Sequence, residues 1–220
     1  MINIEIDHFL YAGPDLKLLI MDVAGRSGIT AAAGGRHPDW GTHNALIGLE
    51  NRSYLELIAP EPGAEGPWGS LFGRLDGPSL QAWCVRAGSA DRVAGRLERA
   101  GVASRRVEGG RELPDGGRLT WGLVFPFGHG FGGALPFFID WRDSVHPSSN
   151  LAAAARLTRF TVLHPDAAAL GQVLAGVGVP PPLLHVVEAG RISLAAAMDS
   201  EGGQFVLEGV LAPHAYLGEA

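Results

Sequence analysis

The chain has little of several features that commonly identify a function. Its one cysteine, Cys84, cannot form an internal disulfide, and the apolar residues around it favour a buried structural thiol over a reactive one. The sequence contains no apolar run of about 18 residues and no basic segment leading into one, so we expect no membrane span and a cytoplasmic location. The formal charge of −6 gives no basic surface of the kind that binds nucleic acid.

What the chain does contain is a repeated pattern. An apolar run of strand type, a short turn and an aspartate that opens a helical pattern occur three times, and Asp15, Asp91 and Asp166 are separated by steps of 76 and 75 residues. Each helical pattern has apolar residues at i, i+3, i+4 and i+7, ends near a glycine, and is followed by about three strand-like segments. A period of this length indicates duplicated supersecondary units.

The repeat predicts an α+β fold built from tandem βαβββ units. We place the units at residues 1–60, 79–142 and 156–212, with residues 60–78 and 142–156 as linkers. One helix covers only one face of its sheet, and adjacent units can cover the other by packing side by side as curved mixed sheets around a cup. We expect the first two units to pair in this way, and the third to cap the pair or to form a subunit contact in a homodimer.

Three polar residues lie inside apolar strand patterns, where burial without a partner costs about 1–3 kcal/mol. They are His8, Glu56 and Asp140, and strand alternation places His8 on the same face as Ile6. One imidazole and two carboxylates from separate strands can bind a divalent metal such as Fe, Mn, Ni, Zn or Mg. The alternative is structural, with Glu56 facing solvent, His8 hydrogen-bonded and Asp140 paired with an arginine.

The segment at residues 34–46 is rich in hydrogen-bond donors and aromatic rings. Its candidate ligand-binding residues are Arg36, His37, Trp40, His43 and Asn44. They suit a small polar or anionic ligand, with Arg36 as a two-point clamp. The alternative is a surface loop in which Trp40 fills the core.

Four motifs carry a resemblance to a known family. They read DHFLYA from Asp7, GRHPDWGTHNAL from Gly35, YLELIAP from Tyr54 and PFFIDWRDSVHP from Pro136. With the tandem units, they resemble the vicinal oxygen chelate superfamily and, more narrowly, its glyoxalase-like domain group. In the metal-dependent members of that superfamily, paired units form a cup, and the metal ligands come from the first and last strands of each unit.

The resemblance implies that His8, Glu56 and Asp140 are metal ligands. We place the first-strand slot of the second unit on Trp83 and that of the third unit on Arg159, and neither residue is an ordinary metal ligand. A site with three ligands and open positions would remain, for which His43 is a possible substitute ligand.

Two functions follow as hypotheses. The first is a metal-dependent lyase, isomerase or dioxygenase acting on a small oxygen-rich metabolite, with Glu56 or His43 as general base. The residues that would position the substrate are Arg36, His37, Trp40, His43 and Asn44. The second is a metal-free protein that binds a small molecule in the cup, with Trp83 as a stacking floor. A structural or dimerisation module is favoured instead if no cavity forms between the first two units.

Overall fold

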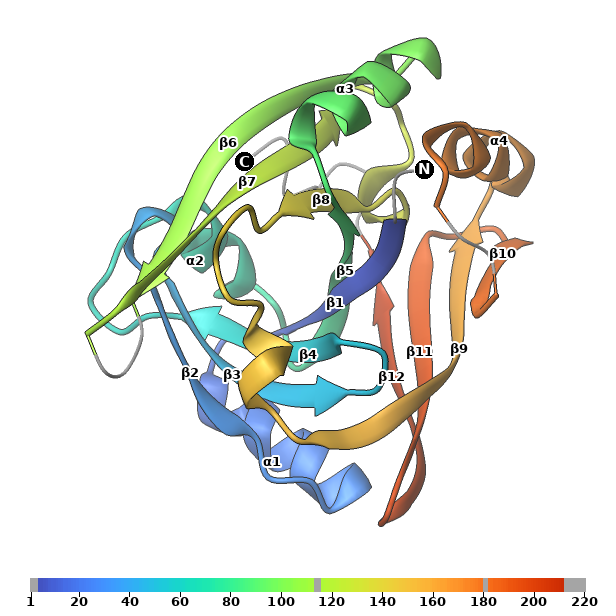
Figure 1. Ribbon diagram of the computed structural model, residues 1–220. Coiled ribbons are helices and arrows are strands. Elements are labelled where there is room, and N and C mark those ends of the chain that lie inside the picture. Colours follow the sequence, from blue (N-terminus) through green and yellow to red (C-terminus); the bar gives the residue numbers. More distant parts are fainter. Residues whose placement is uncertain (1–3, 113–115, 180–181, 212–220) are drawn as a thin grey trace.

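Each third of the chain folds as a strand, a helix and three further strands (Figure 1). The first unit contains β1 (Ile4–Ala12), α1 (Leu16–Ser27), β2 (Ala32–His37), β3 (Thr42–Leu49) and β4 (Ser53–Pro60). The second contains β5 (Ser79–Ala87), α3 (Ala90–Arg99), β6 (Ala103–Glu112), β7 (Arg118–Phe127) and β8 (Phe137–Asp140). The third contains β9 (Ala153–His164), α4 (Ala167–Val177), β10 (Leu184–Glu188), β11 (Ser193–Ser200) and β12 (Gly203–Val210). The computed structural model describes residues 4–112, 116–179 and 182–211, and it confirms an α+β fold of tandem βαβββ units.

The repeated aspartates begin two of the three repeat helices. Asp15 accepts a hydrogen bond from the Leu18 amide at the start of α1, and Asp166 caps α4 in the same way. In α3 the cap is Ser89, and Asp91 lies in the first turn, where its charge still favours the positive end of the helix. Within the described ranges, no helix is long and apolar enough to cross a membrane.

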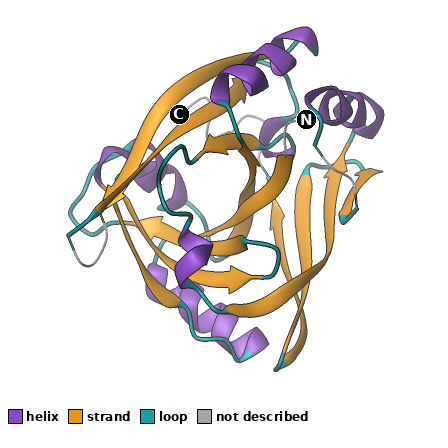
Figure 2. Ribbon diagram, viewed as in Figure 1, coloured by secondary structure: helices purple, strands orange, loops and turns teal. Residues whose placement is uncertain are grey.

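Strands of the first two units form a ring around a common interior (Figures 1 and 2). β1 pairs antiparallel with β5, which joins the two units, and each of these strands also pairs parallel with the last strand of its own unit, β4 or β8. The pairing continues from β8 through β7, β6, β2 and β3 back to β4. β2 meets β6 at a single residue pair, Arg36 with Glu112, so the curved sheet forms a cup that is barely joined on that side.

The third unit covers the outside of this ring. β9 continues the sheet beside β3. Phe160 of β9 packs against Phe9 of β1 and Trp83 of β5, with 4.9 and 5.0 Å between ring centroids. Side chains of β11 and β12 join the same core, so protein fills the face that a lone unit would leave bare. The third unit therefore caps the pair, and a homodimer contact made by it stays a prediction.

The segment between the first two units is more than a linker. It contains the helix α2 (Pro67–Phe72), in which Trp68 and Phe72 are buried. Two glycines let this helix dock closely, because a Cβ at Gly66 or Gly69 would lie 2.2 or 2.3 Å from backbone atoms of residues 40 and 41. Proline and glycine, which made this segment resemble a loop, here begin a helix and permit its contact with the first unit.

Candidate functional site

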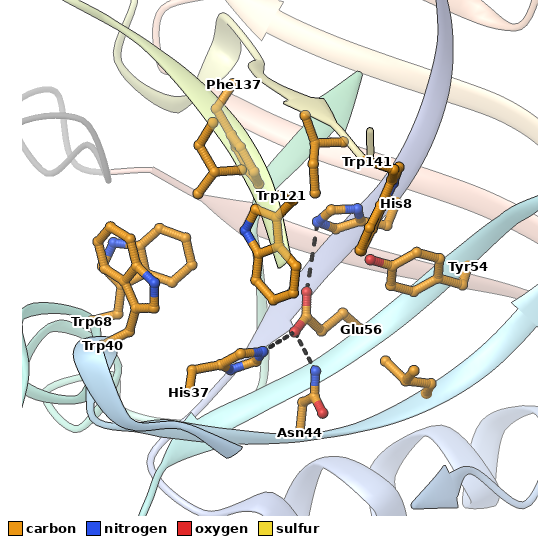
Figure 3. A pocket seen from close by; sticks show the side chains of 13 residues that line it. His8, His37, Trp40, Asn44, Tyr54, Glu56, Trp68, Trp121, Phe137 and Trp141 are labelled. Carbon is orange, nitrogen blue, oxygen red and sulfur yellow. Dashed lines mark hydrogen bonds and ion pairs between the residues drawn. The ribbon is translucent and has the colours of Figure 1, made fainter. Parts of the chain in front are cut away.

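A pocket lies inside the ring, between the first and second units (Figure 3). It encloses about 470 Å³ of empty space, part of which is open to solvent. Four side chains of its wall are polar, and the rest are aromatic or aliphatic. The lining residues are His8, His37, Trp40, Asn44, Leu46, Tyr54, Glu56, Trp68, Trp121, Leu123, Phe137, Ile139 and Trp141. The cavity expected between the two units is therefore present.

Among the described residues that line the pocket, the acidic one is Glu56 of β4, and only 7% of its surface is exposed. Its Oε1 accepts a hydrogen bond from Asn44 Nδ2 at 2.5 Å and lies 3.9 Å from His37 Nε2. Its Oε2 faces His8 Nε2 at 3.6 Å, which is beyond hydrogen-bond length. One carboxylate oxygen is therefore held, while the other faces an imidazole without a short bond to it.

His8 reaches the pocket because β1 contains a bulge. The pairing with β5 shifts register between Ile6 and His8, which makes Asp7 an extra residue on this strand. Ile6 packs against the outer core, whereas His8 lines the pocket, and Asp7 Oδ1 lies 2.7 Å from His8 Nδ1. The expectation that His8 shares a face with Ile6 is wrong, because it assumed unbroken alternation along the strand.

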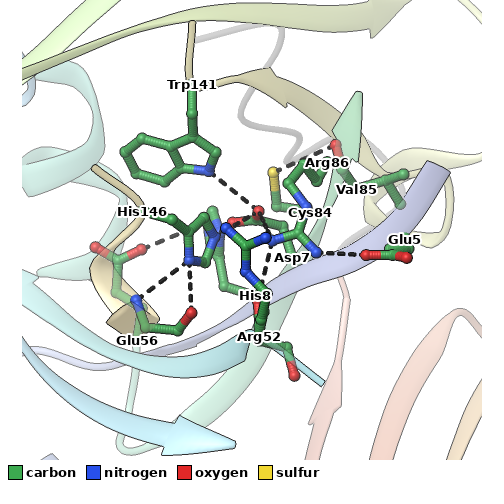
Figure 4. A network of polar contacts seen from close by, with 12 residues as sticks. Glu5, Asp7, His8, Arg52, Glu56, Cys84, Val85, Arg86, Trp141 and His146 are labelled. Atoms are coloured by element: carbon green, nitrogen blue, oxygen red, sulfur yellow. Dashed lines mark hydrogen bonds and ion pairs between the residues drawn. The ribbon is translucent and has the colours of Figure 1, made fainter. Parts of the chain in front are cut away.

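Asp7 Oδ1 contacts Nδ1 of the His8 imidazole (Figure 4). An ionised carboxylate can only accept, so the hydrogen in this contact belongs to His8 Nδ1, and Nε2 of the neutral ring carries a lone pair that faces Glu56. Stacking on Tyr54, with 4.7 Å between ring centroids, holds the ring in place. A carboxylate on one ring nitrogen that leaves the other nitrogen reactive is how proteins orient catalytic histidines.

Asp7 is held in turn by two residues that follow β8. Its Oδ2 accepts hydrogen bonds from Trp141 Nε1 at 3.1 Å and from His146 Nε2 at 2.9 Å. The Ser148 amide donates to His146 Nδ1, so Nε2 is the nitrogen that carries the hydrogen. Burial opposes the ionisation of Asp7, but the hydrogen bonds from His146 and His8 outweigh it and hold the Asp7 pKa well below its usual range. Asp7 is therefore a buried carboxylate at neutral pH.

The segment expected to bind ligand contributes three of its five candidate residues to the pocket. His37, Trp40 and Asn44 line the wall. The Gly35 amide donates to Asn44 Oδ1 at 2.7 Å, which turns Nδ2 toward the carboxylate in the pocket. Gly34 makes this arrangement possible, because a Cβ at that position would lie 1.9 Å from Asn44 Oδ1.

The other two residues of that segment lie outside the pocket. Arg36 Nη2 contacts Glu61 Oε1 at 2.6 Å, and 67% of the arginine side chain is exposed. His43 Nδ1 lies 3.3 Å from the second Glu61 oxygen. The structure contradicts the expected roles of Arg36 as a ligand clamp and of His43 as a base, substrate contact or substitute metal ligand, since strand alternation turns both side chains away from the pocket.

Asp140 also lies outside the pocket. Its neighbours Ile139 and Trp141 line the wall, so alternation turns Asp140 to the opposite face of β8. Its Oδ2 accepts a hydrogen bond at 3.2 Å from the amide of Ala90, the first residue of α3. The expectation that Asp140 shares a metal with His8 is therefore wrong, and the side chain supports the start of a helix instead.

Replacing Asp140 by alanine will lower stability and leave the pocket unchanged. The substitution removes the side-chain acceptor of the Ala90 amide and leaves the Ser89 cap in place, which costs about 1 kcal/mol of unfolding free energy. Urea unfolding measures this cost, and the near-ultraviolet circular dichroism of the tryptophans reports on the pocket. A changed tryptophan signal with an unchanged unfolding midpoint would contradict this placement of Asp140.

The second unit presents Cys84, not Trp83, in the slot that corresponds to His8. Strand pairing sets His8 opposite Cys84, and the 76-residue repeat gives the same position. Cys84 belongs to the inner cluster of side chains, whereas Trp83 is fully buried in the outer core and donates to Ala134 O at 3.0 Å. The expected role of Trp83 as a ligand-stacking floor is therefore wrong.

The donors around the pocket do not complete a metal site. The distance between His8 Nε2 and Glu56 Oε2 would allow both atoms to bind one metal ion, each at a metal–ligand distance of about 2.1 Å. The matching slots of the second unit hold Cys84 and Ile139. Ile139 has no donor atom, and burial raises the pKa of the Cys84 thiol well above its usual value, with Asp7 and Glu56 adding to the effect. Catalytic metal sites usually keep three protein ligands. His37 is the other imidazole of the wall, but its ring nitrogens do not come within 4.8 Å of both His8 and Glu56 donors, so this donor set is one short.

A second grouping, Asp7, His8 and Cys84, brings potential ligand atoms within 4.8 Å of one another. Its chemistry does not suit an ion either. Both Asp7 oxygens are engaged by His8 and His146, and the thiol is held in its protonated form. No other cluster of three such ligands is found in the part of the chain that the structure describes.

Comparison with known proteins agrees with this architecture. A family model for a glyoxalase-like domain matches residues 6–178. A hypothetical protein from Staphylococcus aureus has a TM-score of 0.64 at 14% identity, over 96% of this chain and 87% of that protein. A hypothetical protein from Bacillus halodurans has a TM-score of 0.50 at 16% identity, over 65% and 98% of the two chains. Methylmalonyl-CoA epimerase from Mycobacterium tuberculosis has a TM-score of 0.48 at 21% identity, over 63% and 88%. The search of curated proteins gives no match.

The fold and the paired units define a protein of the vicinal oxygen chelate superfamily. Since the family model matches most of its length, the chain belongs to the glyoxalase-like domain family. The likeness to the solved structures concerns the fold, and the reaction has to be argued from the pocket itself.

Several pocket residues were not anticipated from the sequence. They are Tyr54, Trp68, Trp121, Phe137 and Trp141, and behind the wall the hydrogen-bonded pair Asp7 and His146 was not anticipated either. Two signals were available: an acidic residue directly before His8 in a strand, and the concentration of tryptophan near the resemblance motifs, because four of the five tryptophans line the pocket.

Proposed function

We propose that this protein is an enzyme that moves a proton at a carbon next to a carbonyl group of a small oxygen-bearing metabolite, as isomerases and lyases do. The state of Glu56 supports this proposal. It is a buried carboxylate with one oxygen held by Asn44 and the other 3.6 Å from the free Nε2 of His8. A carboxylate placed in this way inside an apolar wall is suited to act as a general base.

In the proposed first step, Glu56 Oε2 takes the proton from the substrate carbon. The electron pair of the broken C–H bond forms a C=C bond, and the carbonyl π electrons move to the oxygen, which gives an enolate. His37 Nε2, on the other side of the carboxylate, is placed to donate a hydrogen bond to a substrate oxygen. The proton is then returned to a neighbouring atom, directly by Glu56 or through His8 Nε2, and Asp7 stabilises the imidazolium that forms in the second case.

This proposal predicts activity without a bound metal. After removal of metal by a chelator, we expect unchanged activity, and calorimetric titration with Mn²⁺, Fe²⁺, Ni²⁺, Zn²⁺ or Mg²⁺ should show only weak, substoichiometric binding, because the donor set is incomplete. His8→Ala is the matched control and should behave like the wild type in the titration. One equivalent of tightly bound metal that disappears in His8→Ala would instead support the metal-dependent lyase, isomerase or dioxygenase implied by family resemblance.

Exchange of substrate protons with solvent deuterium tests the proton transfer itself. Hydroxyacetone, butanone and benzylacetone each carry exchangeable protons next to a carbonyl. Incubation with the protein in D₂O, followed by proton NMR, should show exchange of at least one compound well above the buffer rate. Exchange of all three at the buffer rate would contradict the proposal.

The aromatic wall favours a second function, the sequestering of a small molecule without turnover. Six of the thirteen lining residues are aromatic, and such walls bind ligands tightly without any chemistry. The two functions differ in one measurement, since tight binding of a ketone without deuterium exchange would identify a binding protein.

A further inference from the structure

We propose that the substrate of this pocket is an uncharged carbonyl compound that carries an aromatic ring. This inference rests on the proton-transfer function proposed above and adds the class of molecule on which it acts. The observation behind it is the juxtaposition, among the described lining residues, of a wall of indole rings with one carboxylate and no lysine or arginine.

The charge of the wall argues against an anionic substrate. No lysine or arginine is among the described residues that line the pocket, so the basic neighbours of the Glu56 carboxylate in the wall are the imidazoles of His8 and His37. Arg36 is bound to Glu61 outside, and Arg86 lies behind the wall, 3.8 Å from Asp7. An anion would therefore lie against a buried carboxylate without the permanent positive charge of a lysine or arginine, which is unfavourable in a low-dielectric site. A cationic substrate would pair with the carboxylate and weaken it as a base.

The arrangement of the indoles indicates where a ring would lie. Trp40 and Trp68 lie on one side of the pocket with 4.4 Å between ring centroids, and Trp121 lies between them and Glu56 (Figure 3). Trp121 also contacts Trp141 at 5.3 Å in an edge-to-face arrangement. A substrate ring that packs against these indoles would direct an attached carbonyl chain toward the carboxylate, because aromatic pairs prefer stacked and edge-to-face contacts at these separations.

Trp68 adds a requirement for the ligand at the end of the pocket opposite Glu56, because it carries a buried hydrogen-bond donor. Its side chain is 6% exposed and lines the pocket, and its Nε1–H has no hydrogen-bond acceptor among the described residues. Ligand oxygen at this end would satisfy the buried donor. The substrate class therefore has two oxygen sites, a carbonyl near Glu56 and a hydroxyl or ether oxygen on the ring near Trp68.

Calorimetric titration with four matched compounds tests this inference. Benzylacetone is a neutral aryl ketone, benzylpyruvate has a carboxylate in place of its methyl group, butanone lacks the ring, and para-hydroxybenzylacetone adds an oxygen to the ring. We expect benzylacetone to bind about tenfold more tightly than benzylpyruvate or butanone. We expect the para-hydroxy compound to bind more tightly still, and Trp68→Phe to remove that gain.

Two variants connect these affinities to the proposed residues. Glu56→Gln removes the repelling charge, so benzylpyruvate should bind nearly as well as benzylacetone, whose own affinity should change little. Trp83→Phe removes the one tryptophan outside the pocket, and quenching of the remaining fluorescence by benzylacetone should persist. The wild-type calorimetry does not depend on the folding of either variant.

The inference is overturned if benzylpyruvate binds the wild type as tightly as benzylacetone, or if butanone does. It is also overturned if Glu56→Gln leaves the preference for the neutral ketone unchanged. These outcomes are distinct from failure of the proposed function, which would appear as normal benzylacetone binding without deuterium exchange.

Discussion

Glu56→Gln will reduce the rate of solvent deuterium exchange into the substrate by about 10²–10⁴-fold. Glutamine has nearly the same shape as glutamate and can still accept the hydrogen bond from Asn44 Nδ2, so the wall of the pocket is preserved. What the variant loses is the carboxylate that takes the proton. Binding of benzylacetone should stay within about twofold of the wild type, since this ligand makes its main contacts with aromatic rings.

Glu61→Gln is the matched control for this experiment. Glu61 directly follows β4, the strand that carries Glu56, and it too contacts a histidine, but it lies outside the pocket beside Arg36 and His43. The Glu61→Gln variant should exchange substrate protons with solvent deuterium at the rate of the wild type. Equal activity of Glu56→Gln and the wild type, or equal losses in the two variants, would show that Glu56 is not the base.

Asp7→Asn will lower the unfolding free energy at pH 7 by about 3–5 kcal/mol. Asp7 is fully buried, and it accepts hydrogen bonds from His8, Trp141 and His146. Asparagine has one carbonyl oxygen, so its amide group would face at least one of these donors and leave it unpaired. Urea unfolding followed by circular dichroism measures the loss. Asp22→Asn, which breaks a more exposed pair with Arg26 on α1, should cost only about 1 kcal/mol.

The same substitution will change the pH dependence of stability. The Asp7 pKa is lower in the folded protein than in the unfolded chain, where an aspartate titrates near pH 4. Its contribution is therefore complete above about pH 4 and is lost as the pH falls further, because the unfolded chain then binds a proton that the folded protein does not. The stability difference between wild type and Asp7→Asn should be largest near pH 7 and should shrink below about pH 4. A difference independent of pH would contradict this role of the buried carboxylate.

The fold was predictable because it depends on long, redundant patterns. Three helical patterns with the same apolar spacing each follow a strand-like segment. Because one helix covers only one face of a sheet, this repetition was enough to predict packed βαβββ units. His8 and Glu56 stood out because a polar residue in an apolar strand needs a reason, and the structure brings these two together in the pocket. The density of polar and aromatic residues in one short segment indicated His37, Trp40 and Asn44. All three line the pocket, and their part in ligand binding stays a prediction.

The wrong predictions concern strand residues, because a shift of one residue in a strand turns a side chain to the opposite face of the sheet. The bulge at Asp7 turns both Asp7 and His8 inward, and alternation turns Asp140 and His43 outward, although each is a single position away from a residue that lines the pocket. A strand pattern in one sequence cannot reveal a bulge, because the extra residue is defined by its partner strand. Trp68 was missed for another reason, since its contact with Trp40 joins a supposed linker to the first unit.

Nitrogen-15 NMR of the His8 imidazole shows which ring nitrogen carries the hydrogen, and it needs no substrate. The claim is that Asp7 keeps the hydrogen on His8 Nδ1, so that Nε2 presents a lone pair to Glu56. With assignment by comparison to His8→Gln, the neutral ring should show a protonated Nδ1 and an unprotonated Nε2, and Asp7→Asn should weaken or reverse that preference. A wild-type spectrum with the hydrogen on Nε2 would contradict the account, because His8 could then not accept a proton from Glu56.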